Sequence, residues 1–184
     1  MKHVAIKAVL TALLFLFVQA QMTTVEAQER TTDRVWASPN AAVSQTIGLT
    51  VVEVTYGRPS VRDRDIFGDL VPFGEVWRTG ANESTAITFS DDVLVNGEEV
   101  EAGTYSLYTI PGSNEWTIIF NDKLSWGTQY DEREDVVRIS AVPEESYPME
   151  QMLIYFENIN AESGDMFIHW DDVRVPVTIE PVED

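Results

Sequence analysis

Short stretches in which apolar and polar residues alternate recur along most of the chain. In residues 51–56 and 84–89 every second side chain is β-branched or aromatic, as with Val52, Val54 and Tyr56. Alternation of this kind places successive side chains on opposite faces of a strand. Both stretches therefore predict half-buried β-strands, and no stretch shows a convincing amphipathic helix.

Turn residues join further apolar runs into predicted hairpins. Asn96-Gly97 separates residues 93–95 from 98–101, and this dipeptide readily adopts the positive φ angles of a two-residue hairpin turn. Residues 104–110 and 116–120 flank Pro-Gly-Ser-Asn, so they are predicted to form a central antiparallel pair.

The C-terminal third predicts more strands, over residues 136–142 and 152–156, and a last hairpin that pairs 166–170 with 173–179. Pro176 cannot donate a hydrogen bond to a ladder, so the final strand is predicted to lie at a sheet edge.

About ten short strands without helices predict an all-β domain, a single antiparallel β-sandwich; an open β-barrel is the alternative. Residues 60–74 fit no strand pattern and are predicted to form a long, partly packed loop. Long ordered loops on a rigid scaffold often carry function.

The N-terminus has the order of a secretory signal peptide: basic residues, an apolar run over 8–18, then small residues. The run is shorter than the roughly 20 residues of a membrane-spanning helix. Cleavage is predicted after Ala20 or Ala27, and Ala27 is favoured. We then expect a flexible segment over 28–36 and one domain over 37–184, exported to the periplasm or secreted.

The chain is strongly acidic, with 12 basic and 31 acidic residues and a net charge of −19. Removal of residues 1–27 leaves 10 basic and 30 acidic residues, a net charge of −20. This field disfavours nucleic acid as a partner, and we expect no membrane insertion after cleavage. The acid also favours solubility in a salty medium. Cysteine is absent, which excludes disulfides and thiolate chemistry.

Four segments carry a resemblance to a known family: SPNAAVSQTIG, YGRPSVRDRDIFGDLVPFGEVWRTGANE, AGTYSLYTIPGSNEWTIIFN and WGTQY. Together they resemble exported bacterial proteins grouped as domain of unknown function 2911. The resemblance spans about residues 37–177 and is most specific over 58–83, although Arg62-Asp63 departs from the family pattern. It implies an exported β-rich domain and no established reaction.

Positive charge is concentrated in one segment of this acidic chain, at Arg58, Arg62, Arg64 and Arg78. Guanidinium groups beside aromatic rings can hold a carboxylate, phosphate or sulfate, or stack on a flat ligand or sugar. The favoured alternative is that these arginines pair with nearby carboxylates and pin the loop to the sheet. The candidate carboxylates are Asp63, Asp65, Asp69, Glu75 and Glu83.

In the stretch 73–85, successive side chains are predicted to point to opposite faces and so to have different roles. Trp77 is predicted to anchor the core, with Arg78 on the opposite face. Residues 80–82, Gly-Ala-Asn, are predicted to turn the chain into the next strand. Glu83 is either the partner of Arg78, which is favoured, or a catalytic acid. The candidate ligand-binding residues are Arg58, Arg62, Arg64, Arg78, Asn82 and Glu83.

Catalytic and metal signals are weak. His169 is the only histidine after the signal peptide, and a buried or surface strand role is favoured over a general base. The pairs Asp91-Asp92 and Asp171-Asp172 are interpreted as solvated charges rather than calcium ligands. We expect no metal or other cofactor.

Three functions stay open. The preferred one is a ligand-binding or interaction module of the cell envelope that uses the arginines and aromatics of residues 58–83 to engage an anionic small molecule or glycan. The second is a hydrolase of carbohydrates or esters that uses Glu83 with another carboxylate, or His169 with a serine. The third is a scaffold subunit that pairs through an edge strand.

Overall fold

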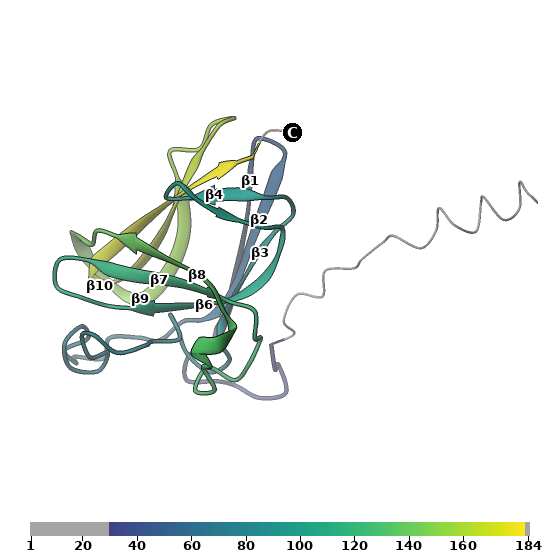
Figure 1. Ribbon diagram of the computed structural model, residues 1–184. Helices are drawn as coiled ribbons and strands as arrows, with labels where there is room; N and C mark the ends of the chain where they lie inside the picture. The colour runs from purple at the N-terminus through teal and green to yellow at the C-terminus, as the bar shows by residue number, and fades with distance from the viewer. Residues whose placement is uncertain (1–29, 183–184) are drawn as a thin grey trace, which may run out of the picture.

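The computed structural model describes residues 30–182, and the predicted signal peptide lies outside this range. Two antiparallel sheets of six and four strands face each other, with almost no helix in the described residues (Figure 1). The predicted β-sandwich is therefore confirmed. No helix among residues 30–182 is long and apolar enough to cross a membrane.

The larger sheet has the order β1-β2-β3-β6-β7-β8. Its pairs β2–β3 and β6–β7 confirm the predicted strands of residues 51–56 and 84–89 and the predicted central hairpin. Each apolar face turns inward; in β2, for example, Val52, Val54 and Tyr56 are buried. The bounds are β1 Asn40–Ile47, β2 Thr50–Gly57, β3 Thr85–Phe89, β6 Gly103–Ile110, β7 Trp116–Asn121 and β8 Asp135–Ala141.

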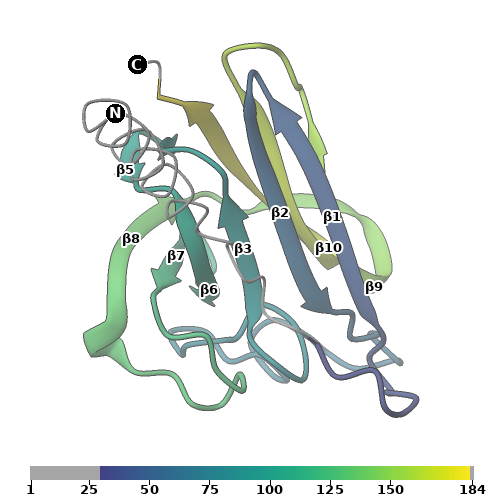
Figure 2. The same cartoon turned by 90° about the vertical axis from the view of Figure 1, so that its right-hand side faces the viewer.

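The smaller sheet has the order β5-β4-β10-β9. Asn96 and Gly97, with φ of 47° and 86°, form the predicted turn between β4 and β5. Figure 2 shows β10 and β9 crossing behind β1 and β2. The bounds are β4 Val93–Val95, β5 Glu98–Val100, β9 Glu144–Glu157 and β10 Gly164–Pro181, and one 3-10 turn spans Glu132–Glu134.

The predicted C-terminal hairpin is wrong, because β10 is one continuous strand. Its register shifts on both sides of Asp171, whose φ is 54°, so an apparent turn is a bulge within the strand. The predicted edge position is also wrong. Pro176 is tolerated inside the sheet because it lies between two ladders, to β9 up to Arg174 and to β4 from Ile179 onward.

Aromatic rings fill one end of the core. Phe67 packs edge-on against Trp116 with ring centroids 5.0 Å apart, and Trp77 stacks on Trp170 at 5.8 Å and 17°. Trp116 and Trp170 are buried, while Phe67 and Trp77 are partly buried against them. These contacts confirm Trp77 as a core anchor. Because Trp116 lies on β7 and Trp170 on β10, they also hold the irregular segment that carries Phe67 and Trp77 against both sheets.

The N-terminal part of the domain is fastened to the same end. The sequence predicts a flexible segment over 28–36, and the described part of it begins with Arg30, which is buried. The Arg30 guanidinium donates hydrogen bonds to the carbonyls of Ala81 at 2.9 Å and Ser84 at 3.0 Å. Residues 30–31 are therefore tied to the corner that precedes β3.

Candidate functional site

Residues 58–84 cross one end of the sandwich with only isolated bridges to the sheets, and they include the loop predicted over 60–74. Val61 donates to the Glu150 carbonyl of β9, and Trp77 exchanges backbone hydrogen bonds with Thr109 of β6. Backbone hydrogen bonds thus tie the segment to both sheets. Arg62 follows Val61 in a left-handed conformation, with a φ of 52°.

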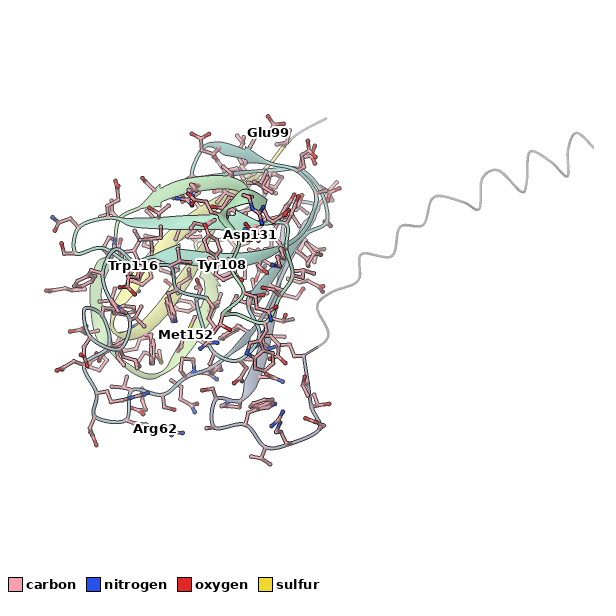
Figure 3. The ribbon with its side chains drawn as sticks, turned by 60° about the horizontal axis from the view of Figure 1, so that its bottom comes forward. Arg62, Glu99, Tyr108, Trp116, Asp131 and Met152 are labelled. Carbon is pink, nitrogen blue, oxygen red and sulfur yellow. The ribbon has the colours of Figure 1, made fainter. Side chains whose placement is uncertain are left out.

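A cleft of about 350 Å³ opens at this end, and its size falls within the range of small-molecule sites. Three of the four candidate arginines, Arg62, Arg64 and Arg78, line it. Figure 3 brings the bottom of Figure 1 forward and shows Arg62 on a loop at the outer edge of the molecule. The other lining residues are Ala37, Ser38, Pro59, Ser60, Leu70, Val71, Trp77, Gly80, Ala81 and Trp170.

The three cleft arginines are oriented by backbone carbonyls. Arg64 donates to the Ser60 carbonyl at 2.6 Å and the Val61 carbonyl at 2.9 Å. Arg62 donates to the Ala37 carbonyl at 3.2 Å, and Arg78 to the Asn82 carbonyl at 3.1 Å. A guanidinium has five N–H donors, so these bonds position each group and leave donors available to a ligand.

The expectation that these arginines pair with carboxylates of their own segment is wrong. Within residues 30–182, none of Arg58, Arg62, Arg64 and Arg78 has a carboxylate at ion-pair distance. The five remaining arginines of that range all do: Arg30, Arg34, Arg133, Arg138 and Arg174. Backbone carbonyls take the place of the expected carboxylates, within the segment for Arg64 and Arg78 and outside it for Arg58 and Arg62.

Nearby acids interact with one another instead. Burial, followed by repulsion from Asp172, Asp65 and Glu150, raises the pKa of Asp171. Glu150 also accepts a hydrogen bond from the backbone N–H of Arg62, not from its guanidinium. The positive charge of the cleft is therefore not neutralised by direct contact.

Glu83 pairs with Arg30, at 3.4 Å, rather than with Arg78, so the favoured pairing is corrected. Both side chains are about 94% buried, with 6% of each exposed. Burial raises the pKa of Glu83, but hydrogen bonds from its own N–H and from Thr31, with the charge of Arg30, bring that pKa below its usual value. A carboxylate that stays ionised in this way is a poor proton donor near neutral pH.

Two other candidates lie beside the cleft but do not line it. Arg58 donates to the Met152 carbonyl at 2.8 Å, which ties the end of β2 to β9. Asn82, with a φ of 67°, donates from its amide to the Ser38 carbonyl at 3.0 Å. Gly80 also has a positive φ, 155°, which confirms the predicted corner. Of these three residues only Gly80 lines the cleft.

Trp170 forms part of the cleft wall, although the sequence does not single it out. Its side chain is buried, and its indole N–H has no hydrogen-bond acceptor within residues 30–182. Trp77, stacked on it, also lines the cleft, so Trp77 and Arg78 contribute to one site rather than to opposite surfaces. No local pattern reveals Trp170, because β10 brings it in from far along the chain.

His169 shows no catalytic arrangement. It is fully buried, its Nε2 donates to the Tyr147 carbonyl at 3.0 Å, and its Nδ1 has no partner in the described part of the chain. Neither a serine nor a carboxylate is therefore bonded to the ring there. Glu83, bonded to Arg30 and Thr31, shares no partner with it. Residues 30–182 contain no group of three or more histidines and carboxylates placed to hold a metal ion.

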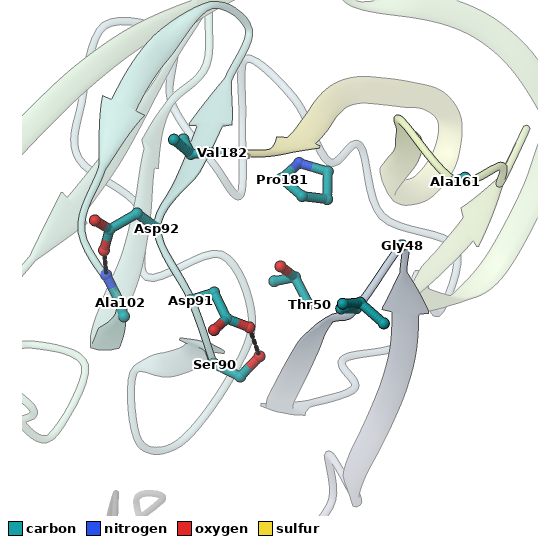
Figure 4. Close-up of a pocket in the computed structure, with 10 residues that line it drawn as sticks. Gly48, Thr50, Ser90, Asp91, Asp92, Ala102, Ala161, Pro181 and Val182 are labelled. Carbon is teal, nitrogen blue, oxygen red and sulfur yellow. Dashed lines mark hydrogen bonds between the residues drawn. The ribbon is translucent and has the colours of Figure 1, made fainter. Parts of the chain in front are cut away.

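A second hollow of about 770 Å³ lies at the opposite end of the sandwich, among the β1–β2 turn, the β3–β4 turn and Pro181 (Figure 4). Its two acids are used locally: Asp91 accepts from the Ser90 hydroxyl and Asp92 from the Ala102 N–H, both at 2.7 Å. No basic residue lines this hollow. Although this hollow is the larger of the two, it lacks the charged donors of the first cleft, which is lined by Arg62, Arg64 and Arg78 and is called the arginine cleft below.

Comparisons with known proteins identify a family without a described activity. No curated protein and no solved structure matches the chain. A family model described as a protein of unknown function, DUF2911, matches residues 38–179, which include both sheets apart from the last two residues of β10, and every lining residue of the arginine cleft except Ala37. The chain therefore belongs to the DUF2911 family.

Proposed function

We propose that this protein is an exported ligand-binding module of the bacterial cell envelope that holds a small anion in the cleft of Arg62, Arg64 and Arg78. One observation carries the proposal. Of the nine arginines within residues 30–182, the five outside segment 58–83 pair with carboxylates, whereas the four inside it do not. Three of those four line one cleft.

Arginines without carboxylate partners can bind an anion through charge-assisted hydrogen bonds. Guanidinium groups form short, paired bonds to carboxylate, phosphate or sulfate oxygens, and each such bond contributes about 1.5–3 kcal/mol. The carbonyls of Ser60, Ala37 and Asn82 hold the groups before a ligand arrives. Less side-chain freedom is then lost on binding.

The test uses calorimetry and thermal shift with phosphate, sulfate and glucuronate on the protein without residues 1–27. Binding is expected to raise the Tm. At a ligand concentration of 100 Kd the free energy of unfolding increases by about 2.7 kcal/mol. Arg62→Ala and Arg64→Ala, both at exposed positions, are expected to remain folded and to lose the rise.

Arg133→Ala is the matched control. Arg133 is exposed and pairs only with Asp131, outside the cleft, so its removal is expected to leave the shift unchanged. If all three anions stabilise the two cleft variants as much as the wild type, or if none binds the wild type, an anion-binding function is ruled out.

A further inference from the structure

Two tryptophans pack together close to the arginine cleft, Trp126 exposed and Trp36 half-buried. The rings of Trp36 and Trp126 lie 6.1 Å apart, centroid to centroid, at an angle of 48°. Trp126 is 41% exposed. The Arg34 guanidinium lies 4.1 Å from the centre of the Trp36 ring and so stacks on it. Because Trp36 supports Trp126 from one side, the exposed part of the Trp126 ring offers an aromatic surface to a ligand.

This pair, which we call the tryptophan platform, is continuous with the cleft. Trp36 is followed by Ala37 and Ser38, which line the cleft. Trp126 is followed by Gly127, where an added Cβ would lie 2.3 Å from the Cδ of Arg78. The Arg78 side chain is thus packed between the cleft and the chain that carries Trp126.

From this continuity we propose that the ligand is an acidic oligosaccharide, with one sugar ring stacked on Trp126 and the carboxylate or sulfate of a neighbouring sugar held by Arg62, Arg64 and Arg78. The inference rests on the proposed anion-binding function and specifies its ligand class. The C–H groups of a sugar face pack against an aromatic ring, while guanidinium groups bind the acidic substituent.

An acidic peptide fits this surface less well. Peptides commonly bind a β-rich protein by adding a strand through backbone hydrogen bonds. Around the cleft, the carbonyls of Ala37, Ser60, Val61 and Asn82 already accept from the protein's own arginines. An acidic sugar can bind through the Trp126 ring and the guanidinium groups alone, without free backbone carbonyls.

Calorimetry on the protein without residues 1–27 compares tetragalacturonate, sulfated maltotetraose, neutral maltotetraose, tetraglutamate and inorganic phosphate. At least one acidic oligosaccharide is expected to bind about 10-fold or more tightly than phosphate, the difference that an added contact of about 1.4 kcal/mol provides. The two acidic sugars separate carboxylate from sulfate recognition.

Trp126→Ala is expected to weaken acidic-oligosaccharide binding about 10-fold and to leave phosphate binding unchanged. Arg62→Ala is expected to weaken both. Tyr147→Ala is the aromatic control, because Tyr147 is 64% exposed and lies on β9 outside this surface; it is expected to bind as the wild type does. Far-ultraviolet circular dichroism confirms that each variant is folded.

The outcomes separate the two proposals. If phosphate binds but neither acidic sugar binds more tightly, or if Trp126→Ala has no effect, the oligosaccharide proposal is overturned and anion binding stands. Equal or tighter binding of tetraglutamate, or binding of maltotetraose as tight as that of the acidic sugars, also overturns it. If no probe binds the wild type, both proposals fail.

Discussion

Replacement of Arg30 by alanine tests the most buried ion pair of the described chain. Arg30 pairs with Glu83 and donates to the carbonyls of Ala81 and Ser84 and to the side chain of Asn40. Alanine would leave the Glu83 carboxylate buried without its cation and would remove the donors of these acceptors. Breaking a buried pair from one side costs about 3–5 kcal/mol.

That loss is large for a domain whose total stability is about 5–15 kcal/mol, and it corresponds to a Tm decrease of about 6–20 °C at 2–4 °C per kcal/mol. Urea unfolding followed by tryptophan fluorescence measures it as a lower midpoint with an unchanged slope. Arg133→Ala removes an exposed ion pair that water and salt screen, so it is expected to leave the urea midpoint nearly unchanged.

A double variant, Arg30→Met with Glu83→Gln, separates the pair from the surrounding contacts. Because it leaves no buried charge, it is expected to recover part of the stability that Arg30→Ala loses. If Arg30→Ala costs less than about 1 kcal/mol, or if the double variant is no more stable than Arg30→Ala, residues 30–31 do not anchor the corner as described.

Three further predictions concern single groups. The folded pKa of Glu83 is lowered, so its contribution to stability is complete above the unfolded value of about 4.3 and is lost as pH falls through the lower folded value; Glu83→Gln is expected to flatten this acid limb in urea titrations. Gly80→Ala is expected to lower the free energy of unfolding by about 1–3 kcal/mol, since φ is 155° and the new Cβ would lie 3.0 Å from the Gly57 carbonyl oxygen; an unchanged urea midpoint would contradict this. Burial, then the hydrogen bond to Asp135, raises the pKa of Tyr130 to about 12. In tyrosine NMR titrations its resonance is expected to stay unshifted where an ordinary tyrosine, with a pKa of about 10, has titrated.

Local patterns were sufficient to predict most of the strands. Alternation placed β2 and β3, and Asn96-Gly97 placed the β4–β5 turn, because each depends only on neighbouring residues. The failures lie where pairing over long distances overrides local signals. Asp171 has a turn-like conformation inside a strand, and Pro176 lies within a central strand between two ladders.

The candidate site was predicted only in part. Composition was enough to single out Arg62, Arg64 and Arg78, since positive charge is rare in this chain. The partners of Glu83 and the wall residue Trp170 were not predictable, because Arg30 and β10 approach the site from the two ends of the domain. Charge clusters are visible in a sequence, but which charges stay unpaired depends on the fold.

The contrast between the cleft and the whole chain bears on which anions can bind. A net charge of −20 on the chain without residues 1–27 repels any polyanion at long range, and salt screens that repulsion beyond roughly 8 Å at physiological ionic strength. The guanidinium groups of Arg62, Arg64 and Arg78 act at contact distance, where screening is weak. On the proposal of an acidic oligosaccharide ligand, a short chain with its charge on one or two sugars would meet the local attraction with little of the overall repulsion, whereas an extended polyanion would meet both. The acidic surface therefore favours short acidic ligands over long ones, and this preference increases as the salt concentration falls.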